Sequence, residues 1–434
     1  MVDPSELSAS EARRLIGRRE LSPTELLEAC ISRIEAINPK INAIVATDFA
    51  RARMEAMLAE KAVLTGAVLP PLHGLPIGIK DLNATQDLRT TWGSKLFENH
   101  VPSKDEALVT RLRAAGGIIV GKTNTPEFGS GTATDNLVYG PTRNPFDLER
   151  TPGGSSGGSA AALATNMLPL CQGSDTGGSL RNPATWCGVV GFRSTPGLIS
   201  RENRTLNYTH FNVQGPMARS VADISLMMAG CVGNDERDPM ADRCNPQAFL
   251  EIEPTDLKNV RVGWTEDFGG VAPLDNGIRD CFRAVIGALG NIFHSIDGRD
   301  PDFSDARDCF WTLRCVNYLA SHAIRYEDHR DILSENIIKN VEAGKKMSLS
   351  DVSKAEVQWR KIYQDFEVFF EDIDLLIVPG NATPAFRIDD GIPHEINGEK
   401  MKNYMDASLI RSALTLTGHP VIAMPCGYDH IGLP

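Results

Sequence analysis

The sequence predicts an α/β fold with a largely parallel sheet. Residues 105–115 have helical composition and lead directly into residues 116–121, whose Ile118, Ile119 and Val120 indicate a buried strand. Further short apolar segments alternate with helical ones, at 77–79, 260–264 and 373–378, and the last of these is predicted to be a buried strand. No internal repeat or low-complexity linker divides the 434 residues, which favours one domain over 1–434.

The remaining elements follow in order along this domain. Ser8 and Ser22 are each followed three residues later by a glutamate, which predicts two helix starts, and Pro39 predicts the end of the second helix. With an extended stretch at 41–45 and a helix at 49–61, these form an N-terminal helical segment, 1–65. A core region, 66–240, and a variable part with C-terminal strands, 241–434, complete the division. Within the variable part, residues 300–370 are predicted to be mostly helical.

The composition narrows the class of protein. With 42% hydrophobic and 23% charged residues the chain has ample material for a core, and its net charge of −12 argues against a general nucleic-acid-binding surface. The nine cysteines are scattered without metal-ligand spacing, so we expect no metal and reduced, buried thiols. No secretory signal or apolar run of membrane-spanning length is visible. The sequence therefore predicts a cytoplasmic protein without membrane contact.

The most distinctive stretch, residues 151–197, holds two clusters of glycine and serine. The first is 153–159 (GGSSGGS) and the second 175–179 (DTGGS). A flexible linker would need polar, structureless flanks, whereas apolar segments lie on both sides. A phosphate-binding loop would need a GxxxxGK[ST] or GxGxxG motif in a strand–turn–helix setting, which is lacking. We favour a serine nucleophile, Ser179, preceded by glycines that leave backbone N–H groups free for an oxyanion.

A serine nucleophile requires a base, and histidine is the usual one. No histidine lies between His100 and His210, although a remote one could fold in. Lys80 closes a short apolar strand. One interpretation is a surface charge at a strand end; the other is a buried lysine whose lowered pKa would let it act as a base. The residues alone leave both interpretations open.

Taken together, these motifs resemble those of the amidase signature family of serine hydrolases. The resemblance rests on the order and spacing of 78–81 (GIKD), 153–159, 177–179 with Arg181 and Pro183, and on 121–124, 140–145 and 188–192. The match is dense from about residue 22 to 240 and thins afterwards, returning at 374–379 and 416–427. It implies a large, mixed but mostly parallel central sheet, covered by helices on both faces.

The resemblance also implies roles for individual residues. Ser179 would be the nucleophile, Ser155 a bridging serine behind a cis peptide bond from Gly154, and Lys80 the base. The backbone N–H groups of Thr176, Gly177, Gly178 and Ser179 would form the oxyanion hole. Ser156 would support Lys80 or Ser155, and Asp175 and Arg181 are expected to orient the loop rather than to contact substrate. Neither a cofactor nor a metal is implied.

The implied reaction is acyl transfer on a small-molecule amide. Neutral Lys80 would draw a proton from Ser155, which draws one from Ser179; the acyl-enzyme would then be hydrolysed. Because free lysine titrates near ~10.4, activity should grow toward alkaline pH. The substrate is not indicated by the sequence, no direct nucleic-acid contact is expected, and a homodimer is compatible with the resemblance.

Two departures from the family pattern bear on these expectations. The family continues beyond residue 434 through another strand and a helix, which predicts a chain truncated at its C-terminus. Thr125 and Pro126 stand where the glutaminase subunit of the tRNA-dependent amidotransferase tends to have Met-Asp, which favours a stand-alone amidase over that subunit. A third alternative, an inactive binding or scaffold homologue, would usually have lost Lys80, Ser155 or Ser179, and all three are present.

Overall fold

The N-terminal part of the chain is helical, as predicted. The computed structural model describes residues 3–434. Residues 1 and 2, which belong to the N-terminal stretch in which no secretory signal is predicted, lie outside the described part. Three α-helices come first: α1 (Ala9–Gly17), α2 (Pro23–Ile41) and α3 (Phe49–Leu64). Ser22 and Glu25 form the predicted capping box at the start of α2.

The predicted end of α2 at Pro39 is wrong by a few residues. The helix continues to Ile41, and Asn42 ends it in the left-handed conformation with φ of 56°. The Asn42 N–H still bonds the Asn38 carbonyl at 2.7 Å, so the helix closes one more turn after the proline.

Within the described residues 3–434, seven strands form the central sheet, in the order β1-β3-β2-β4-β6-β5-β12. They are β1 (Ile44–Thr47), β2 (Pro76–Lys80), β3 (Ile118–Thr123), β4 (Leu170–Asp175), β5 (Val190–Arg193), β6 (Val213–Ala218) and β12 (Val421–Ala423). The sheet is mixed, as predicted, but the expectation that it is mostly parallel is wrong. Only β3-β2 and β2-β4 pair in parallel; the other neighbouring pairs are antiparallel. β5 and β6 follow one another without an α-helix between them, which antiparallel pairing allows because it needs no crossover helix.

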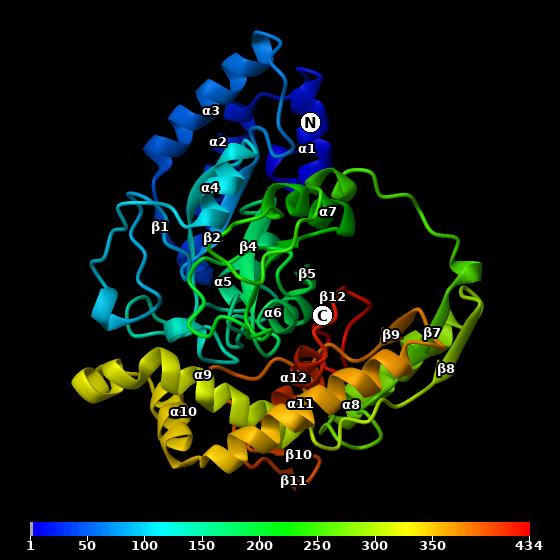
Figure 1. The fold of residues 1–434 in the computed structure, drawn as a ribbon. Coiled ribbons are helices and arrows are strands. Elements are labelled where there is room, and N and C mark those ends of the chain that lie inside the picture. The colour runs from blue at the N-terminus through cyan, green and yellow to red at the C-terminus, as the bar shows by residue number, and fades with distance from the viewer. Residues whose placement is uncertain (1–2) are drawn as a thin grey trace.

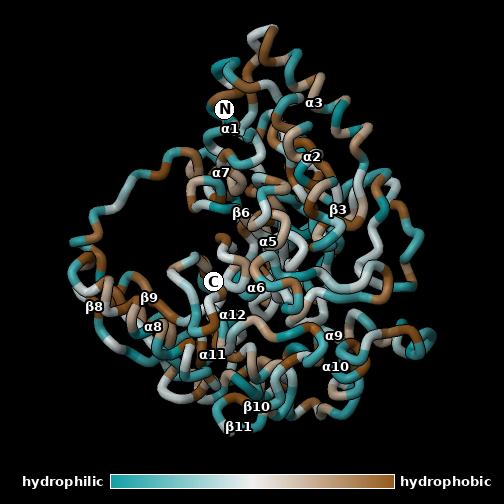
Figure 2. The backbone as a smooth tube through the Cα atoms, turned by 180° about the vertical axis from the view of Figure 1, so that it is seen from behind, coloured by the Kyte–Doolittle hydropathy of each residue, from teal (hydrophilic) through white to brown (hydrophobic). Residues whose placement is uncertain are grey.

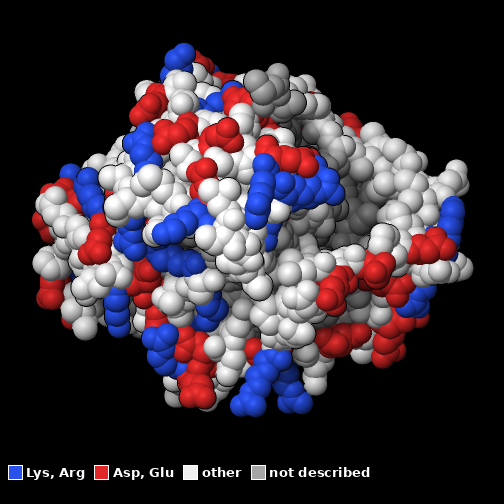
Figure 3. Space-filling model, turned by 90° about the horizontal axis from the view of Figure 1, so that it is seen from above, with Lys and Arg blue, Asp and Glu red and all other residues white. Residues whose placement is uncertain are grey.

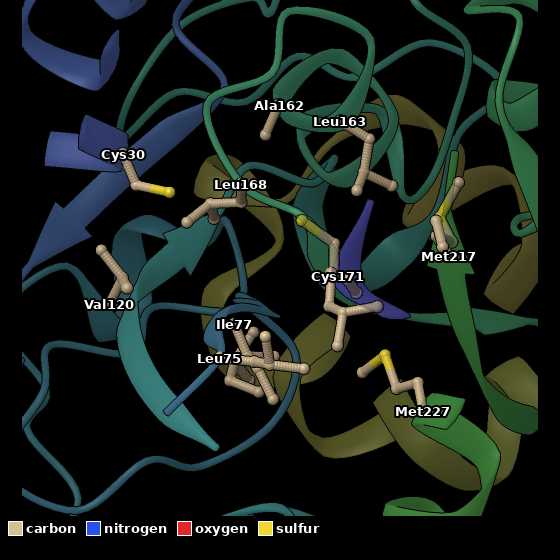
Figure 4. Close-up of a cluster of buried hydrophobic side chains, with 14 of the residues drawn as sticks. Cys30, Leu75, Ile77, Val120, Ala162, Leu163, Leu168, Cys171, Met217 and Met227 are labelled. Atoms are coloured by element: carbon tan, nitrogen blue, oxygen red, sulfur yellow. The ribbon is translucent and has the colours of Figure 1, made fainter. Parts of the chain in front are cut away.

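Helices and loops cover both faces of this sheet. Every residue of β2, β3 and β6 is buried, which requires a covering layer on each side. The nearby helices are α4 (Ala107–Ala114), α5 (Gly157–Ala164), α6 (Arg181–Trp186) and α7 (Val221–Cys231). Figure 4 shows part of the resulting core. Here Ile77 of β2, Cys171 of β4, Met217 of β6 and Met227 of α7 come together.

The second half of the chain adds a separate group of elements. A three-stranded parallel sheet, β8-β7-β9, is formed by β7 (Arg261–Trp264), β8 (Ser295–Gly298) and β9 (Leu375–Ile377). The helices are α8 (Asn276–Leu289), α9 (Ala306–His329), α10 (Glu335–Lys346) and α11 (Leu349–Phe369), which confirms the helical prediction for 300–370. β9 was expected to be buried, but Leu375 is 49% exposed because this strand lies at a sheet edge.

This second group has its own hydrophobic cluster, around Phe303, Phe310 and Phe366. In Figure 1, α9–α11 lie below the central sheet and α1–α3 lie above it. Figure 2 shows brown and teal segments alternating along the helices of the second half, as expected where one face of a helix is buried. A short hairpin, β10 (Glu395–Ile396) and β11 (Glu399–Lys400), precedes α12 (Leu409–Leu416), after which β12 joins the central sheet.

The surface and the cysteines agree in part with the sequence predictions. All nine cysteines are free; six are buried, but Cys244 and Cys281 are partly exposed and Cys426 is exposed, so the expectation that all are buried is wrong. On the face shown in Figure 3, acidic and basic side chains are interspersed. Across residues 3–434, no helix combines the length and apolar character that a membrane span requires.

Candidate active site

The predicted site residues meet at one edge of the central sheet. The parallel strands β2, β3 and β4 end on the same side, with Lys80 at the end of β2 and Asp175 at the end of β4. The register of β2 on β4 places Gly78 opposite Cys171, so Lys80 lies beside the last residues of β4. In open α/β sheets, ligands bind at the carboxyl ends of the strands.

Three serine hydroxyls surround the Lys80 amine. Its Nζ lies 2.7 Å from Ser155 Oγ, 2.9 Å from Ser156 Oγ and 3.0 Å from Ser174 Oγ. Ser155 and Ser156 come just before α5, and the peptide bond between Gly154 and Ser155 is cis, as the family resemblance implied. Of the two interpretations of Lys80, the surface charge is therefore wrong: the side chain is fully buried.

Burial favours the neutral form of this lysine. Loss of solvation lowers the pKa of Lys80 well below its ordinary value, and the nearby Asp175 carboxylate opposes the shift only in part. The N-terminus of α5 begins at Ser156, and the partial positive charge of a helix N-terminus disfavours an ammonium group beside it. A neutral amine in this position can accept a proton.

Counting donors limits where the lone pair of a neutral Lys80 can point. Ser156 Oγ donates to the Ser174 carbonyl at 3.3 Å, so it must accept an N–H from Lys80. The other two neighbours of the amine are the hydroxyls of Ser155 and Ser174. A neutral amine has two N–H donors and one lone pair, so one of these hydroxyls accepts the second N–H and the other can donate its proton to the lone pair.

Ser179 lies in the turn between β4 and α6 and is half-buried. Its carbonyl accepts a hydrogen bond of 3.2 Å from the Ser156 N–H, which ties the two glycine–serine clusters together. Within residues 3–434, no hydrogen bond joins Ser155 Oγ to Ser179 Oγ, so the side-chain contacts connect Lys80 with Ser155 but stop before Ser179. Catalytic hydrogen bonds often tighten only when substrate is bound.

The backbone N–H groups around Ser179 are not equivalent. Among the described residues, Thr176, Gly177 and Ser179 have N–H groups without an acceptor, and all three residues line a cavity. The prediction for Gly178 needs correction, because its N–H donates to Asp175 Oδ1 at 2.9 Å. The carboxylate thereby closes the turn, and Gly178 takes a φ of 120°, where a side chain would be strained.

Asp175 and Arg181 hold this loop from within. Arg181 forms a two-point ion pair with Asp175, at 2.9 and 3.0 Å, and Arg193 adds a contact of 3.4 Å. The two guanidinium groups keep the pKa of Asp175 below its usual value although burial alone would raise it. Arg181 also donates to the Arg411 carbonyl at 2.8 Å, which joins the loop to α12. These contacts tie the loop to its surroundings.

Two residues of the site were missed by sequence reasoning. One is Ser174, which precedes Asp175 on β4 and contacts the Lys80 amine. Residues two apart on a strand face the same side, and Gln172 accepts a hydrogen bond from the Lys80 backbone N–H through its Oε1. This two-residue periodicity is the signal that could have indicated Ser174. Arg411 is buried against Gly178 and bonds Ser408 Oγ at 2.9 Å and Asn381 Oδ1. No local pattern indicates Arg411, because it is more than two hundred residues from Gly178 in the sequence.

A cavity of about 550 Å³ opens over the candidate site. Its floor includes Thr176, Gly177, Gly178 and Ser179. The walls are aromatic and cationic, formed by Trp92, Phe97, Phe128, Phe211, Tyr318, His322, Tyr404, Arg201, Arg204, Arg314, Arg325 and Arg411. The volume suits a small ligand. Among residues 3–434, no group of His, Cys, Asp and Glu is arranged to hold a metal ion.

Comparisons with known proteins extend over nearly the whole chain. A family model described as Amidase matches residues 25–434. An acylamidase of Rhodococcus erythropolis is 32% identical over 430 residues, covering 99% of this chain and 90% of that protein. One subunit of the glutamyl-tRNA(Gln) amidotransferase of Carboxydothermus hydrogenoformans is 32% identical over 451 residues, covering 98% of this chain and 91% of that protein.

Solved structures lead to the same group. A bacterial aryl acylamidase of the amidase signature enzymes superposes with a TM-score of 0.90 at 28% identity, covering 99% of this chain and 91% of that one. The similarity therefore includes the fold as well as the motifs.

Proposed function

The chain belongs to the amidase signature family, and on that premise we propose that it hydrolyses a small carboxylic amide through an acyl-enzyme on Ser179. It is an amidase, a hydrolase that acts on amide carbon–nitrogen bonds. The observation that carries the proposal is the contact of 2.7 Å between Lys80 Nζ and Ser155 Oγ, made by a fully buried lysine.

The first step transfers protons along the three groups. Lys80 accepts the proton of Ser155, and Ser155 takes the proton of Ser179 while Ser179 Oγ forms a bond to the substrate carbonyl carbon. The carbonyl oxygen becomes an oxyanion, for which the N–H groups of Thr176, Gly177 and Ser179 are the available donors. Gly178 contributes shape rather than a donor, because Asp175 already occupies its N–H.

The second half of the reaction returns the protons. The tetrahedral intermediate collapses, the carbon–nitrogen bond breaks, and the leaving nitrogen receives a proton from Ser155, which Lys80 replenishes. Ammonia or an amine leaves, and the acyl group remains on Ser179. Water then attacks the ester, gives its proton back along the same groups, and releases the carboxylic acid. None of these steps requires a cofactor.

Substitution of the nucleophile tests this mechanism. We expect Ser179→Ala to lose ammonia release from a panel of aliphatic, aryl and amino-acid amides, because no oxygen remains to form the acyl-enzyme. Mass spectrometry of wild type during turnover should detect a covalent acyl adduct on the peptide that contains Ser179. Turnover at the wild-type rate by a folded Ser179→Ala protein would refute the assignment.

The glutaminase subunit is the second candidate. It is supported by amidotransferase relatives with the same 32% identity as the acylamidase, whereas Thr125 and Pro126 depart from that subunit's pattern. A stand-alone amidase should turn over its substrate alone; glutamine turnover that requires a partner protein would support the glutaminase role instead. Free thiols favour a reducing compartment, and we propose the cytoplasm.

A further inference from the structure

A buried arginine, Arg314, lies in the wall of the cavity. It is one helical turn along α9 from Phe310, which lies against the loop that holds Ser179. Phe310 on α9 and Met405 both lie against Gly177: a Cβ built there would be 3.1 and 3.2 Å from them. Arg314 follows Phe310 by four residues on α9, so it lies on the same helix face about 6 Å further along the axis. Tyr404 directly precedes Met405. Both Arg314 and Tyr404 line the cavity that contains Ser179.

All partners of the Arg314 guanidinium are neutral. Its Nε donates to Asn340 Oδ1 at 3.1 Å, and its Nη2 donates to the hydroxyls of Tyr318 and Tyr404, both at 2.7 Å. Within residues 3–434, Arg314 has no ion pair with a carboxylate, although only 5% of it is exposed. No hydrogen-bond partner among these residues is found for its Nη1 either. A buried charge is costly unless it is paired with an opposite charge. None of the described residues supplies a negative charge to Arg314, so a ligand could supply it.

A second donor beside Arg314 is left free by the same hydrogen bonds. Tyr404 Oη accepts from Arg314 Nη2 and from Asn340 Nδ2, each at 2.7 Å. Both neighbours bring their own hydrogens, so the Tyr404 O–H proton must point to another acceptor, and none is found among the described residues. The neighbouring Tyr318 differs, because its O–H donates to Ser130 Oγ at 2.9 Å. Arg314 Nη1 and the Tyr404 hydroxyl therefore offer adjacent, unused donors.

The other cationic side chains of the cavity are less suited to this role. Arg204 is paired with Asp238 at 2.7 Å, and Arg325 is only half-buried and donates from its Nη1 to the Ser321 carbonyl at 2.6 Å. Arg201 is also half-buried, and the Glu106 and Asp238 carboxylates partly offset the burial that lowers its pKa. Arg411 uses its two Nη atoms on Asn381 and Ser408. Among the described residues that line the cavity, Glu106 is the one acid. The cavity is thus cationic within a chain of net charge −12.

We infer that the substrate amide carries a carboxylate, which Arg314 and Tyr404 bind while the amide group reacts at Ser179. The inference deepens the proposed function and rests on it. A planar carboxylate can accept from an arginine Nη and a neighbouring hydroxyl at once. Its negative charge would complement the Arg314 guanidinium, which has no carboxylate partner among residues 3–434 and is 5% exposed. Arg314 would then determine specificity, since the proton transfers take place at Lys80, Ser155 and Ser179.

The test uses two matched substrate pairs. Glutaramic acid is compared with pentanamide, and N-acetyl-β-alanine with N-propylacetamide, by release of ammonia or amine. We expect wild type to favour the acid in at least one pair by roughly 10- to 100-fold in kcat/KM, because hydrogen bonds to charged groups are strong. Arg314→Gln should bring that ratio close to one, mainly through KM for the acid. Arg325→Gln, on the same helix and lining the same cavity, is the matched control and should keep the ratio.

A milder substitution and a binding measurement keep the inference testable if Arg314→Gln fails to fold. Tyr404→Phe keeps the ring and should lower the acid preference roughly fivefold. In calorimetry on the Ser179→Ala background, where amides should not be turned over, glutarate should bind more tightly than glutaramide, and adding Arg314→Gln should remove that difference. The inference is overturned if wild type shows no acid preference in either pair, or if Arg314→Gln keeps it. Loss of all amide turnover would count against the proposed function instead, and glutarate binding would still test the carboxylate site.

Discussion

The hydroxyl of Ser174 offers the sharpest test of how Lys80 is held. In the proposed mechanism it accepts an N–H of the buried Lys80 amine at 3.0 Å. In Ser174→Ala that acceptor is lost, and a buried donor without a partner costs about 1–3 kcal/mol. If the lone pair of Lys80 is then less well aligned with the Ser155 hydroxyl, this free energy adds to the activation free energy of the proton transfer. A factor of ten in rate corresponds to about 1.4 kcal/mol, so kcat should fall roughly 5- to 150-fold.

The pH profile separates this effect from general damage. A serine oxygen stabilises the ammonium form of Lys80 more than the neutral amine, because the ammonium is the stronger donor. Removing the oxygen should lower the pKa of Lys80 further, so the acid limb of kcat/KM should move to lower pH while the plateau falls. Ser5→Ala, a substitution of a buried serine remote from the site, is the control and should change neither. A lower plateau with an unmoved acid limb would refute the reasoning.

Two further substitutions test the loop and the charge state of the base. Gly178→Ala should lower kcat by roughly 10²–10³-fold, because its Cβ would lie 2.6 Å from Arg411 Nε and displace the oxyanion donors; Gly66→Ala, also at positive φ but with no atom within 4 Å, should leave kcat unchanged, and equal losses would refute the contact argument. Lys80→Met tests the charge state of the base. Burial lowers the pKa of Lys80, so the folded wild type binds fewer protons at this position than the unfolded chain. The free energy of unfolding of wild type should therefore rise with pH toward 10.5. The urea midpoint of Lys80→Met relative to wild type should be highest at low pH and decline toward pH 10.5, and a difference independent of pH would show that Lys80 is charged when folded.

The sequence by itself determined the parts of the site that are local. The glycine–serine clusters place Ser155, Ser156 and Ser179 in turns next to helix starts, and their order relative to Lys80 indicates the family. Such turns depend on backbone conformations that glycine permits, so a short segment carries the information. The prediction of a mostly parallel sheet was wrong, because β5 and β6 follow one another without an α-helix between them, and pairing direction depends on which strands become neighbours.

Only the tertiary structure decided what surrounds these residues. Ser174 reaches Lys80 because β4 pairs with β2 in one register, and the side chains of a strand would face the opposite way after a shift of one residue. Arg314 and Arg411 reach the cavity from α9 and α12, over a hundred residues beyond Ser179. Whether an arginine is paired is a property of its spatial neighbours rather than of its segment. The chemistry of the reaction is therefore indicated in the chain, whereas the features that select the substrate arise from packing.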